Sequence, residues 1–324
     1  MKFSYIFIIL ILTGEVVHGQ RTEQAIDFNQ KTNRIVFEME NDVLFKSDHY
    51  YTAGVALSYL NKKMKHSPAQ LILRGKKKNP NLIRFSGFGF EQRMYTPYSI
   101  IRPDSIPGDR PYAAYILATN FSVLINMEKH LKISNELGLG VMGPAAGGEW
   151  VQSFVHKVIG SPLPIGWENQ LKNAFLIDYQ FRIEKGFFSG WVADHIILFG
   201  KARVGSLTDR IGVGLMLRVG NVNNTLKEYF RPEKYKKRFV WQWVFEANLQ
   251  GVFYDATLQG GLFNGGEAIE LTQQDLISRQ YQVRTGINIY YRCFYFRYMI
   301  KFNSQDFING IIHRYGGINL GFSF

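Results

Sequence analysis

Hydrophobic and polar residues alternate along most of the chain with a period of two. One face of the segment 174–184 is formed by apolar side chains, namely Phe175, Ile177, Tyr179, Phe181 and Ile183. The same alternation recurs in the segments 131–141, 281–291 and 294–302. Alternation that is sustained over about ten residues and repeated along a chain is typical of a transmembrane β-barrel.

The pattern predicts about twelve strands, and an even number is usual for a single-chain bacterial outer-membrane barrel. The predicted strands are 34–42, 51–60, 81–93, 112–124, 130–142, 172–185, 193–204, 210–219, 238–253, 279–292, 294–304 and 313–324. The last strand alternates up to Phe324, which resembles the C-terminal aromatic residue recognised during barrel assembly. A large secreted β-sandwich would also alternate, but the strand length and the Phe and Tyr residues at strand ends favour the barrel. We therefore predict an all-β, antiparallel transmembrane β-barrel.

The first 19 residues are organised like a secretory signal peptide. Lys2 provides a positive start, the apolar run 5–12 follows, and small residues precede Gln20. This run is shorter than the ~20 residues that a membrane-spanning helix needs. An ordinary N-terminal strand is the alternative. We expect residues 1–19 to direct export and residues 20–324 to form one outer-membrane barrel domain.

If both chain ends lie in the periplasm, the connections that follow odd-numbered strands face outward. These connections are 43–50, 94–111, 143–171, 205–209, 254–278 and 305–312. Within 143–171, residues 149–159 contain no Gly or Pro and carry several apolar side chains, which predicts a short helix. Gly160 and Pro162 follow as stop signals. We expect this helix to lie across the outer mouth of the barrel.

Composition and motifs exclude several classes of protein. The 26 Phe, 18 Tyr and 5 Trp exclude a disordered chain, and the single Cys293 excludes an internal disulfide and a cysteine-rich metal site. The net charge is +12, but its densest runs, 76–78 and 234–238, fall in connections expected to face the periplasm. The charge therefore does not identify a partner, and we expect none among nucleic acids. There is no GxSxG, Walker or HExxH motif, and the GxGxxG match at 138–143 lies within a predicted strand.

Two of the outward-facing polar features lie on the first hairpin. Asn41 and Asp42 follow the first strand and offer the oxygen ligands that Ca²⁺ prefers, although Asn-Asp is also common in turns. Thr52 begins the facing strand, where its hydroxyl would position water or substrate, although threonine is also an ordinary strand residue.

The other two features lie in later connections. Arg110 is suited to binding a phosphate or carboxylate, or equally to bracing its turn by pairing with Asp109. Gln152 and His156 are four residues apart and therefore share one face of the predicted helix. Histidine is the side chain best suited to act as a general base near neutral pH, and a structural role for His156 is equally open.

In combination, these motifs resemble the outer-membrane lipid A 3′-O-deacylase family. The matching segments are 41–42, 51–54, 108–110, 143–152 with His156, 159–160, Trp167, Gln170 and 254–259. The resemblance thus extends over essentially the whole mature chain. It implies a barrel that removes the acyloxyacyl chain esterified at the 3′ position of lipid A, with Ca²⁺ as cofactor.

The resemblance also implies roles for individual residues. Asn41 and Asp42 would bind the metal, His156 would be the general base, and Thr52 would belong to the catalytic site. We assign Gln152 and Arg110 to substrate binding. Two positions differ from the family pattern: Pro162 stands where the family can carry a glutamate, with Glu168 as a candidate substitute, and Arg102 lies near the place of a family lysine that steadies the oxyanion.

Two other functions stay open at this point. An outer-membrane phospholipase A would need a Ser–His pair and would leave lipid A intact. A non-catalytic barrel, either a porin or an adhesin scaffold, would conduct ions and would not depend on His156. Our preferred hypothesis is a monomeric outer-membrane ester hydrolase that acts on lipid A of lipopolysaccharide.

Overall fold

The computed structural model describes residues 33–42, 45, 49–61, 64, 67–69, 82–102, 106–126, 128–188, 195–220, 239–264, 266 and 269–324. The predicted signal peptide and both dense basic runs lie outside these residues. The strands are β1 (Asn33–Asn41), β2 (Tyr50–Asn61), β3 (Leu82–Thr96), β4 (Ala113–Asn126), β5 (Leu131–Met142), β6 (Ala174–Phe188), β7 (His195–Gly205), β8 (Thr208–Gly220), β9 (Phe239–Asp255), β10 (Arg279–Tyr291), β11 (Phe294–Asn303) and β12 (His313–Ser323).

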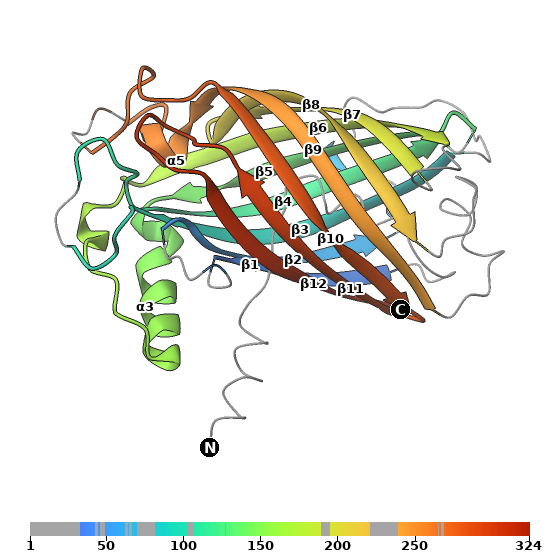
Figure 1. Cartoon of the computed structure of the whole chain (residues 1–324), viewed down its shortest axis with the longest axis horizontal. Coiled ribbons are helices and arrows are strands. Elements are labelled where there is room, and N and C mark those ends of the chain that lie inside the picture. Colours follow the sequence, from blue (N-terminus) through green and yellow to red (C-terminus); the bar gives the residue numbers. More distant parts are fainter. Residues whose placement is uncertain are drawn as a thin grey trace.

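Within this part of the chain, the twelve strands form one closed antiparallel barrel (Figure 1). Each strand pairs with its neighbours in sequence, and β1 closes the barrel by pairing with β12, for example Phe37 with Leu320. The predicted fold class is confirmed. The largest boundary differences are three residues, at the ends of β3 (93 predicted, Thr96 found) and β6 (185 predicted, Phe188 found).

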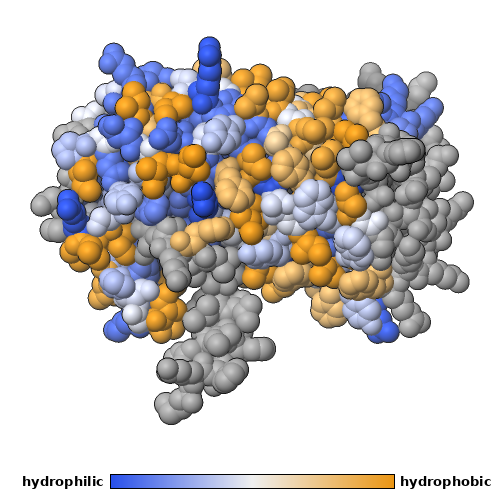
Figure 2. Space-filling view, viewed as in Figure 1, coloured by the Kyte–Doolittle hydropathy of each residue, from blue (hydrophilic) through white to orange (hydrophobic). Residues whose placement is uncertain are grey.

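The two faces of the barrel wall differ as the alternation predicts. Apolar side chains such as Leu57, Phe88 and Leu249 point outward and are exposed, and apolar residues are spread over the outer surface in Figure 2. Charged side chains such as Glu246, Arg284 and Arg297 point inward and are buried. An apolar exterior around a polar interior is the arrangement that a barrel needs in a lipid bilayer.

Four short helices lie at the end of the barrel opposite the two described termini. They are η3 (Pro144–Ala146), α3 (Gly148–Ile159), η4 (Trp167–Asn169) and α5 (Ala256–Gln259). The helix predicted at 149–159 is confirmed as α3, and it ends at Gly160 in the left-handed conformation, with φ of 74°. We call this end of the barrel the loop end.

No helix in the described ranges is both long enough and apolar enough to cross a membrane, a finding that does not concern β-barrels.

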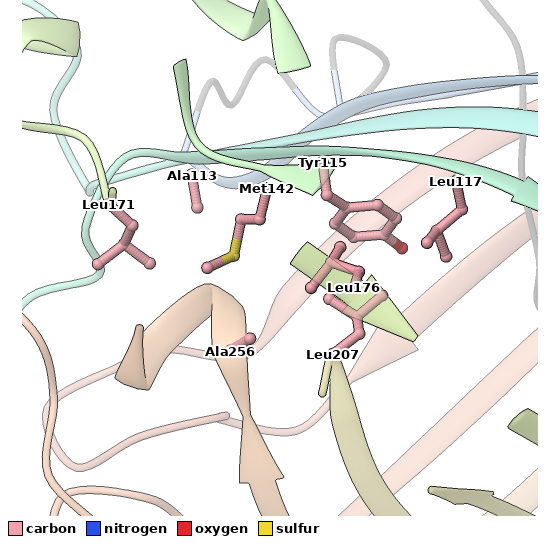
Figure 3. Packing of buried hydrophobic residues seen from close by; sticks show 8 residues of the cluster. All are labelled: Ala113, Tyr115, Leu117, Met142, Leu171, Leu176, Leu207 and Ala256. Atoms are coloured by element: carbon pink, nitrogen blue, oxygen red, sulfur yellow. The ribbon is translucent and has the colours of Figure 1, made fainter. Parts of the chain in front are cut away.

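An apolar cluster fills the loop end of the barrel interior on the side of β4, β5 and β6 (Figure 3). It consists of Ala113, Tyr115, Leu117, Met142, Leu171, Leu176, Leu207 and Ala256. Ala256 belongs to α5, so this helix packs into the barrel rather than over its outer surface. The cluster fixes the ends of the strands from which the connections at the loop end emerge.

Candidate active site on the outside of the barrel wall

Helix α3 carries two opposed stripes of side chains. Gly148, Gln152 and His156 are four residues apart and are all buried. Trp150, Phe154 and Val158 lie on the opposite side and are 71%, 53% and 41% exposed. The rings of Trp150 and Phe154 are stacked with their centroids 5.8 Å apart. The buried stripe is therefore polar and the exposed stripe is apolar, the reverse of a helix on a water-soluble protein.

The buried stripe faces the outer surface of the barrel wall. Tyr95 and Tyr115 line the internal cavity, so their neighbours Met94 and Ala114 point to the opposite, outer face. Met94 and Ala114 form one apolar cluster with Trp167, which follows α3. A Cβ atom on Gly148 would come within 2.5 Å of the Ala114 Cβ, so the helix approaches the wall closely.

The structure thus corrects one expectation. Helix α3 stands beside the loop end of the barrel rather than across its mouth (Figure 1). The physical reason is that each face of α3 finds a suitable environment outside the barrel, one against the wall and the other facing lipid. Gly148, at the start of the buried stripe, packs against Ala114 of β4, and Gln92 of β3 donates a hydrogen bond to Ala146 O, just before α3, at 2.5 Å. Its apolar stripe remains on the lipid-facing side.

The ring of His156 is oriented by the chain that follows α3. Its Nδ1 atom lies 2.6 Å from the carbonyl oxygen of Pro162. A carbonyl oxygen can only accept a hydrogen bond, so Nδ1 must carry the proton. In the neutral imidazole, Nε2 is then the nitrogen with the basic lone pair. The ring is 6% exposed, which keeps bulk water away from it.

Gln152 ties α3 to the segment that packs beneath it. Its Oε1 atom accepts a hydrogen bond from the indole Nε1 of Trp167 at 2.8 Å. Trp167 is 1% exposed and packs on the ring of Tyr112, with the centroids 4.8 Å apart. Since an indole N–H that is buried without an acceptor costs free energy, Gln152 helps to hold the helix against the wall.

Asn41, Asp42 and Thr52 come together at the loop ends of β1 and β2. Asn41 Nδ2 donates to the carbonyl oxygen of Thr52 at 3.1 Å, and the Thr52 hydroxyl lies 2.7 Å from that of Thr96. The Asp42 carboxylate, 1% exposed, accepts a hydrogen bond from the His49 amide at 3.2 Å. Ala53, adjacent to Thr52, packs against the same apolar cluster as Val151 of α3. This polar group therefore lies on the side of the barrel that α3 covers.

The donor set of this group suits a hard cation. Asp42 supplies a carboxylate, Asn41 an amide oxygen, and Thr52 and Thr96 supply hydroxyls, all of them oxygen donors as Ca²⁺ requires. The described residues contain no cluster of three or more His, Cys, Asp and Glu side chains that could hold a metal ion by themselves. The chemistry of the group thus fits calcium, with water or substrate needed to complete the coordination.

The two arginines do not join this group. Arg110 is 3% exposed and turns into the barrel, where its guanidinium donates to Thr257 Oγ1 at 2.5 Å and lies 4.2 Å from the centroid of the Tyr95 ring. It also pairs with Asp306 at 3.3 Å. Arg102 is exposed in the connection after β3, which approaches the α3 segment through the hydrogen bond from Ile165 N to Ile100 O at 2.8 Å.

Sequence reasoning missed three contributions to this site: Thr96, Gln92 and the Pro162 carbonyl. Alternation in β3 places Thr96 on the outward face together with Met94, so its hydroxyl could have been found by extending that strand. Gln92 lies on the same outward face, and alternation alone gives no reason to connect it to Ala146. The carbonyl of Pro162 has no sequence signal, because any residue carries one.

The chain matches known proteins in family and in fold. Residues 6–324 match the family model described as outer membrane protein LpxR. The solved structure described as LpxR from Salmonella typhimurium has a TM-score of 0.71 at 18% identity, covering 90% of this chain and 100% of that one. The beta domain of the Bordetella autotransporter BrkA has a TM-score of 0.45 at 8% identity, covering 91% of this chain and 99% of that one. Among curated proteins there is no significant match.

Proposed function

The chain belongs to the LpxR family of outer membrane proteins, and from this we propose that it is an ester hydrolase that removes the 3′-acyloxyacyl chain of lipid A. The observation that carries the proposal is the position of His156. An imidazole with a defined basic nitrogen is buried on the face of α3 that also carries Gly148, the residue packed against Ala114 of the outer wall. The ester groups of a membrane glycolipid would be within reach on this outer, lipid-facing side of the barrel.

In the proposed reaction, His156 Nε2 accepts a proton from water, and the resulting hydroxide attacks the ester carbonyl carbon. In the next step the bond between the carbonyl carbon and the 3′ oxygen of the sugar breaks. The imidazolium returns its proton to the departing 3′ oxygen, which leaves a 3′-hydroxyl on the glycolipid and a free acyloxyacyl acid. General-base catalysis of this kind contributes about 10²–10⁴-fold in rate. Pro162 O holds the ring in the required tautomer throughout.

The remaining residues would bind the metal ion, stabilise negative charge or hold α3 in place. Asn41 and Asp42, with the hydroxyls of Thr52 and Thr96, would hold Ca²⁺. When bound, the cation would supply positive charge that favours the negative oxygen of the transition state. Arg102 would add positive charge from the neighbouring connection. Gln152 holds α3 in place, and the apolar stripe of Trp150 and Phe154 would lie among the acyl chains. We also propose export through residues 1–19 and a monomeric enzyme.

The proposal is tested with purified protein, lipid A and Ca²⁺, followed by mass spectrometry of the lipid. Wild type is expected to remove the mass of the 3′-acyloxyacyl chain. His156→Asn removes Nε2 but keeps an amide that can donate to the Pro162 carbonyl, so it should be slower by about 10²-fold or more. His130→Asn is the matched control, because His130 lies at the opposite end of the barrel with φ of 47°, which asparagine tolerates.

Equal loss of the acyl mass with His156→Asn and wild type would contradict the assignment of the base. A parallel incubation with phospholipid vesicles tests the phospholipase alternative, which predicts that fatty acid is released from the phospholipid. Conductance in a planar bilayer with no change in lipid A would instead support a non-catalytic barrel.

A further inference from the structure

A polar cavity of about 180 Å³ lies inside the barrel, separated by the wall from the site under α3. Its lining includes seven Lys and Arg side chains: Arg93, Arg110, Arg182, Lys201, Arg203, Arg210 and Lys301. The proposed reaction uses none of them. These residues come from strands and connections on several sides of the barrel, so their positive charges converge on one enclosed space.

Lys201 differs from the other six. Each of the others is within ion-pair distance of a carboxylate, for example Arg203 Nε with Asp178 at 2.7 Å and Arg210 with Asp255 at 3.2 Å. Arg93 and Lys301 share Glu40, Arg110 pairs with Asp306, and Arg182 pairs with Glu184 and Glu246. Across the described part of the chain, Lys201 forms no ion pair and no hydrogen bond. Its amino group therefore lines the cavity without a carboxylate at ion-pair distance.

The strand register places further cations directly beside Lys201. Arg182 of β6 is its direct cross-strand neighbour, and Arg203 lies two residues along on the same face of β7. Arg203 is in turn directly opposite Arg210 of β8. Like charges directly opposite each other in a sheet are destabilising unless something neutralises them. The inner wall of β6, β7 and β8 thus carries two such pairs in adjacent rows.

Arg203 also has an unused donor. Its Nη2 atom is buried and makes no hydrogen bond, and the side chain as a whole is 10% exposed. Gln180 lies opposite Arg203 on β6 and lines the same cavity with its carboxamide. Gly212, the cross-strand neighbour of Lys201 on β8, leaves space for the lysine, since a Cβ there would approach Lys201 Cε to 3.1 Å. Lys201 and the Nη2 atom of Arg203 thus leave hydrogen-bond donors facing the cavity, whose lining also includes the carboxylates of Glu136, Asp255 and Asp306.

We propose that this cavity is a binding site for a phosphate group, held by Lys201, Arg203 and Arg210 with Gln180. A tetrahedral oxyanion offers several acceptor oxygens, so it can accept from the ammonium and both guanidinium groups at once. It would give Lys201 an anionic partner and satisfy the free Nη2 donor of Arg203. The phosphate belongs either to free inorganic phosphate or to a phosphorylated sugar. This site is independent of the proposed ester hydrolysis.

The test is isothermal titration of the detergent-solubilised full-length mature protein at constant ionic strength. Three probes are used: inorganic phosphate, glucose 1-phosphate and glucose. Inorganic phosphate is expected to bind to wild type with a stoichiometry of one, and glucose is expected not to bind. Tighter binding of glucose 1-phosphate identifies a sugar phosphate as the source, whereas tighter binding of inorganic phosphate identifies the free anion.

Variants of Lys201 test whether phosphate binds in this cavity. Lys201→Met removes the unpaired charge at similar length and should weaken phosphate binding at least tenfold, while Lys201→Arg should retain it. Lys185→Met is the matched control, because Lys185 is exposed at the end of the barrel opposite the loop end, where it bonds to Lys129 O at 2.6 Å. Absence of phosphate binding by wild type overturns the proposal whether or not the variants fold. Equal binding by wild type and a folded Lys201→Met also overturns it.

Discussion

The imidazole Nδ1 of His156 donates its hydrogen to the carbonyl oxygen of Pro162, 2.6 Å away. The two residues are separated by six positions, across the turn that ends α3. The contact therefore uses a main-chain oxygen and no side-chain atom of residue 162. The orientation of His156 therefore depends on the path of the backbone and not on the side chain at position 162.

Pro162→Ala tests this dependence. The carbonyl oxygen is retained, so the rate of lipid A deacylation should change by less than about tenfold, corresponding to 1.4 kcal/mol. Insertion of one glycine between residues 160 and 161 moves the carbonyl and should reduce the rate as strongly as His156→Asn. The rates are measured by mass spectrometry of the lipid product. A large loss with Pro162→Ala would show that the proline ring itself is required.

Replacement of Gln152 should loosen α3. Gln152→Leu leaves the buried Trp167 indole without its acceptor, which costs about 1–3 kcal/mol. Hydrogen exchange of the α3 amides should accelerate correspondingly, while exchange in β9 and β10 stays constant. Gln152→Glu keeps an acceptor oxygen and should exchange more slowly than the leucine variant. Identical protection of α3 in all three proteins would contradict this role.

Removal of calcium should abolish activity if Asn41 and Asp42 bind the ion. Chelation by EDTA is expected to stop deacylation and added Ca²⁺ to restore it. Asp42→Asn should raise the Ca²⁺ concentration needed for half-maximal rate, and should also weaken Tb³⁺ luminescence in a binding assay, because a carboxylate is lost from the donor set. Asp275→Asn, in another connection at the loop end, serves as control. Unchanged Tb³⁺ binding by Asp42→Asn would place the metal elsewhere.

The pH dependence of the loop end should include His49. Burial lowers the pKa of His49 below its usual 6.5, and the carboxylate of Asp109 opposes this shift. The neutral ring packs near Tyr98 and His313, with centroids 5.3 and 5.5 Å away. As the pH falls from 6.5 towards the lower folded pKa, the unfolded form gains the proton first, so local stability decreases. Histidine NMR should show a midpoint below 6.5 for His49, and His49→Gln should remove the corresponding acid-dependent increase in hydrogen exchange.

The exposed stripe of α3 should be in contact with lipid. In vesicles that contain brominated acyl chains, Trp150 fluorescence is expected to be quenched, since its ring is 71% exposed beside Phe154. Trp150→Phe should therefore reduce the quenched fraction. Trp167→Phe should not reduce it, because that indole is 1% exposed. Quenching that is insensitive to Trp150→Phe would place α3 in water.

The fold could be predicted almost completely from the sequence. The alternation within each strand shows which side chains face lipid and which face the interior, and repeated strands of this kind form a closed barrel. Most inward residues of β6 and β10 are polar and most outward ones are apolar, with exceptions such as the inward Leu176 and the outward Thr285, so the register follows from the pattern. The parity of the strands also placed Asn41, Thr52 and His156 at one end. The position of α3 beside the outer wall could not be predicted, because the direction of a connection is set by packing such as Gly148 against Ala114.

The directions of individual side chains in connections were the least predictable part. Arg110 was expected beside the substrate, yet its guanidinium is held inside the barrel by Thr257 and Asp306, which are 147 and 196 residues away in sequence. Contacts of this range leave no local pattern. The α3 helix itself was predictable, but its polar buried face and apolar exposed face could be interpreted only after its position beside the wall was known.

The pairing of β1 with β12 determines how such a chain can reach its native state. The hydrogen bond from Arg34 to Ser323 joins residues 289 positions apart, so the closing seam has the longest sequence separation in the sheet. Hairpins between neighbouring strands can form early, whereas the seam must wait for the final segment. Until then, two strand edges remain open to association with other chains. After closure neither edge is left to fray, so the finished barrel is expected to unfold very slowly.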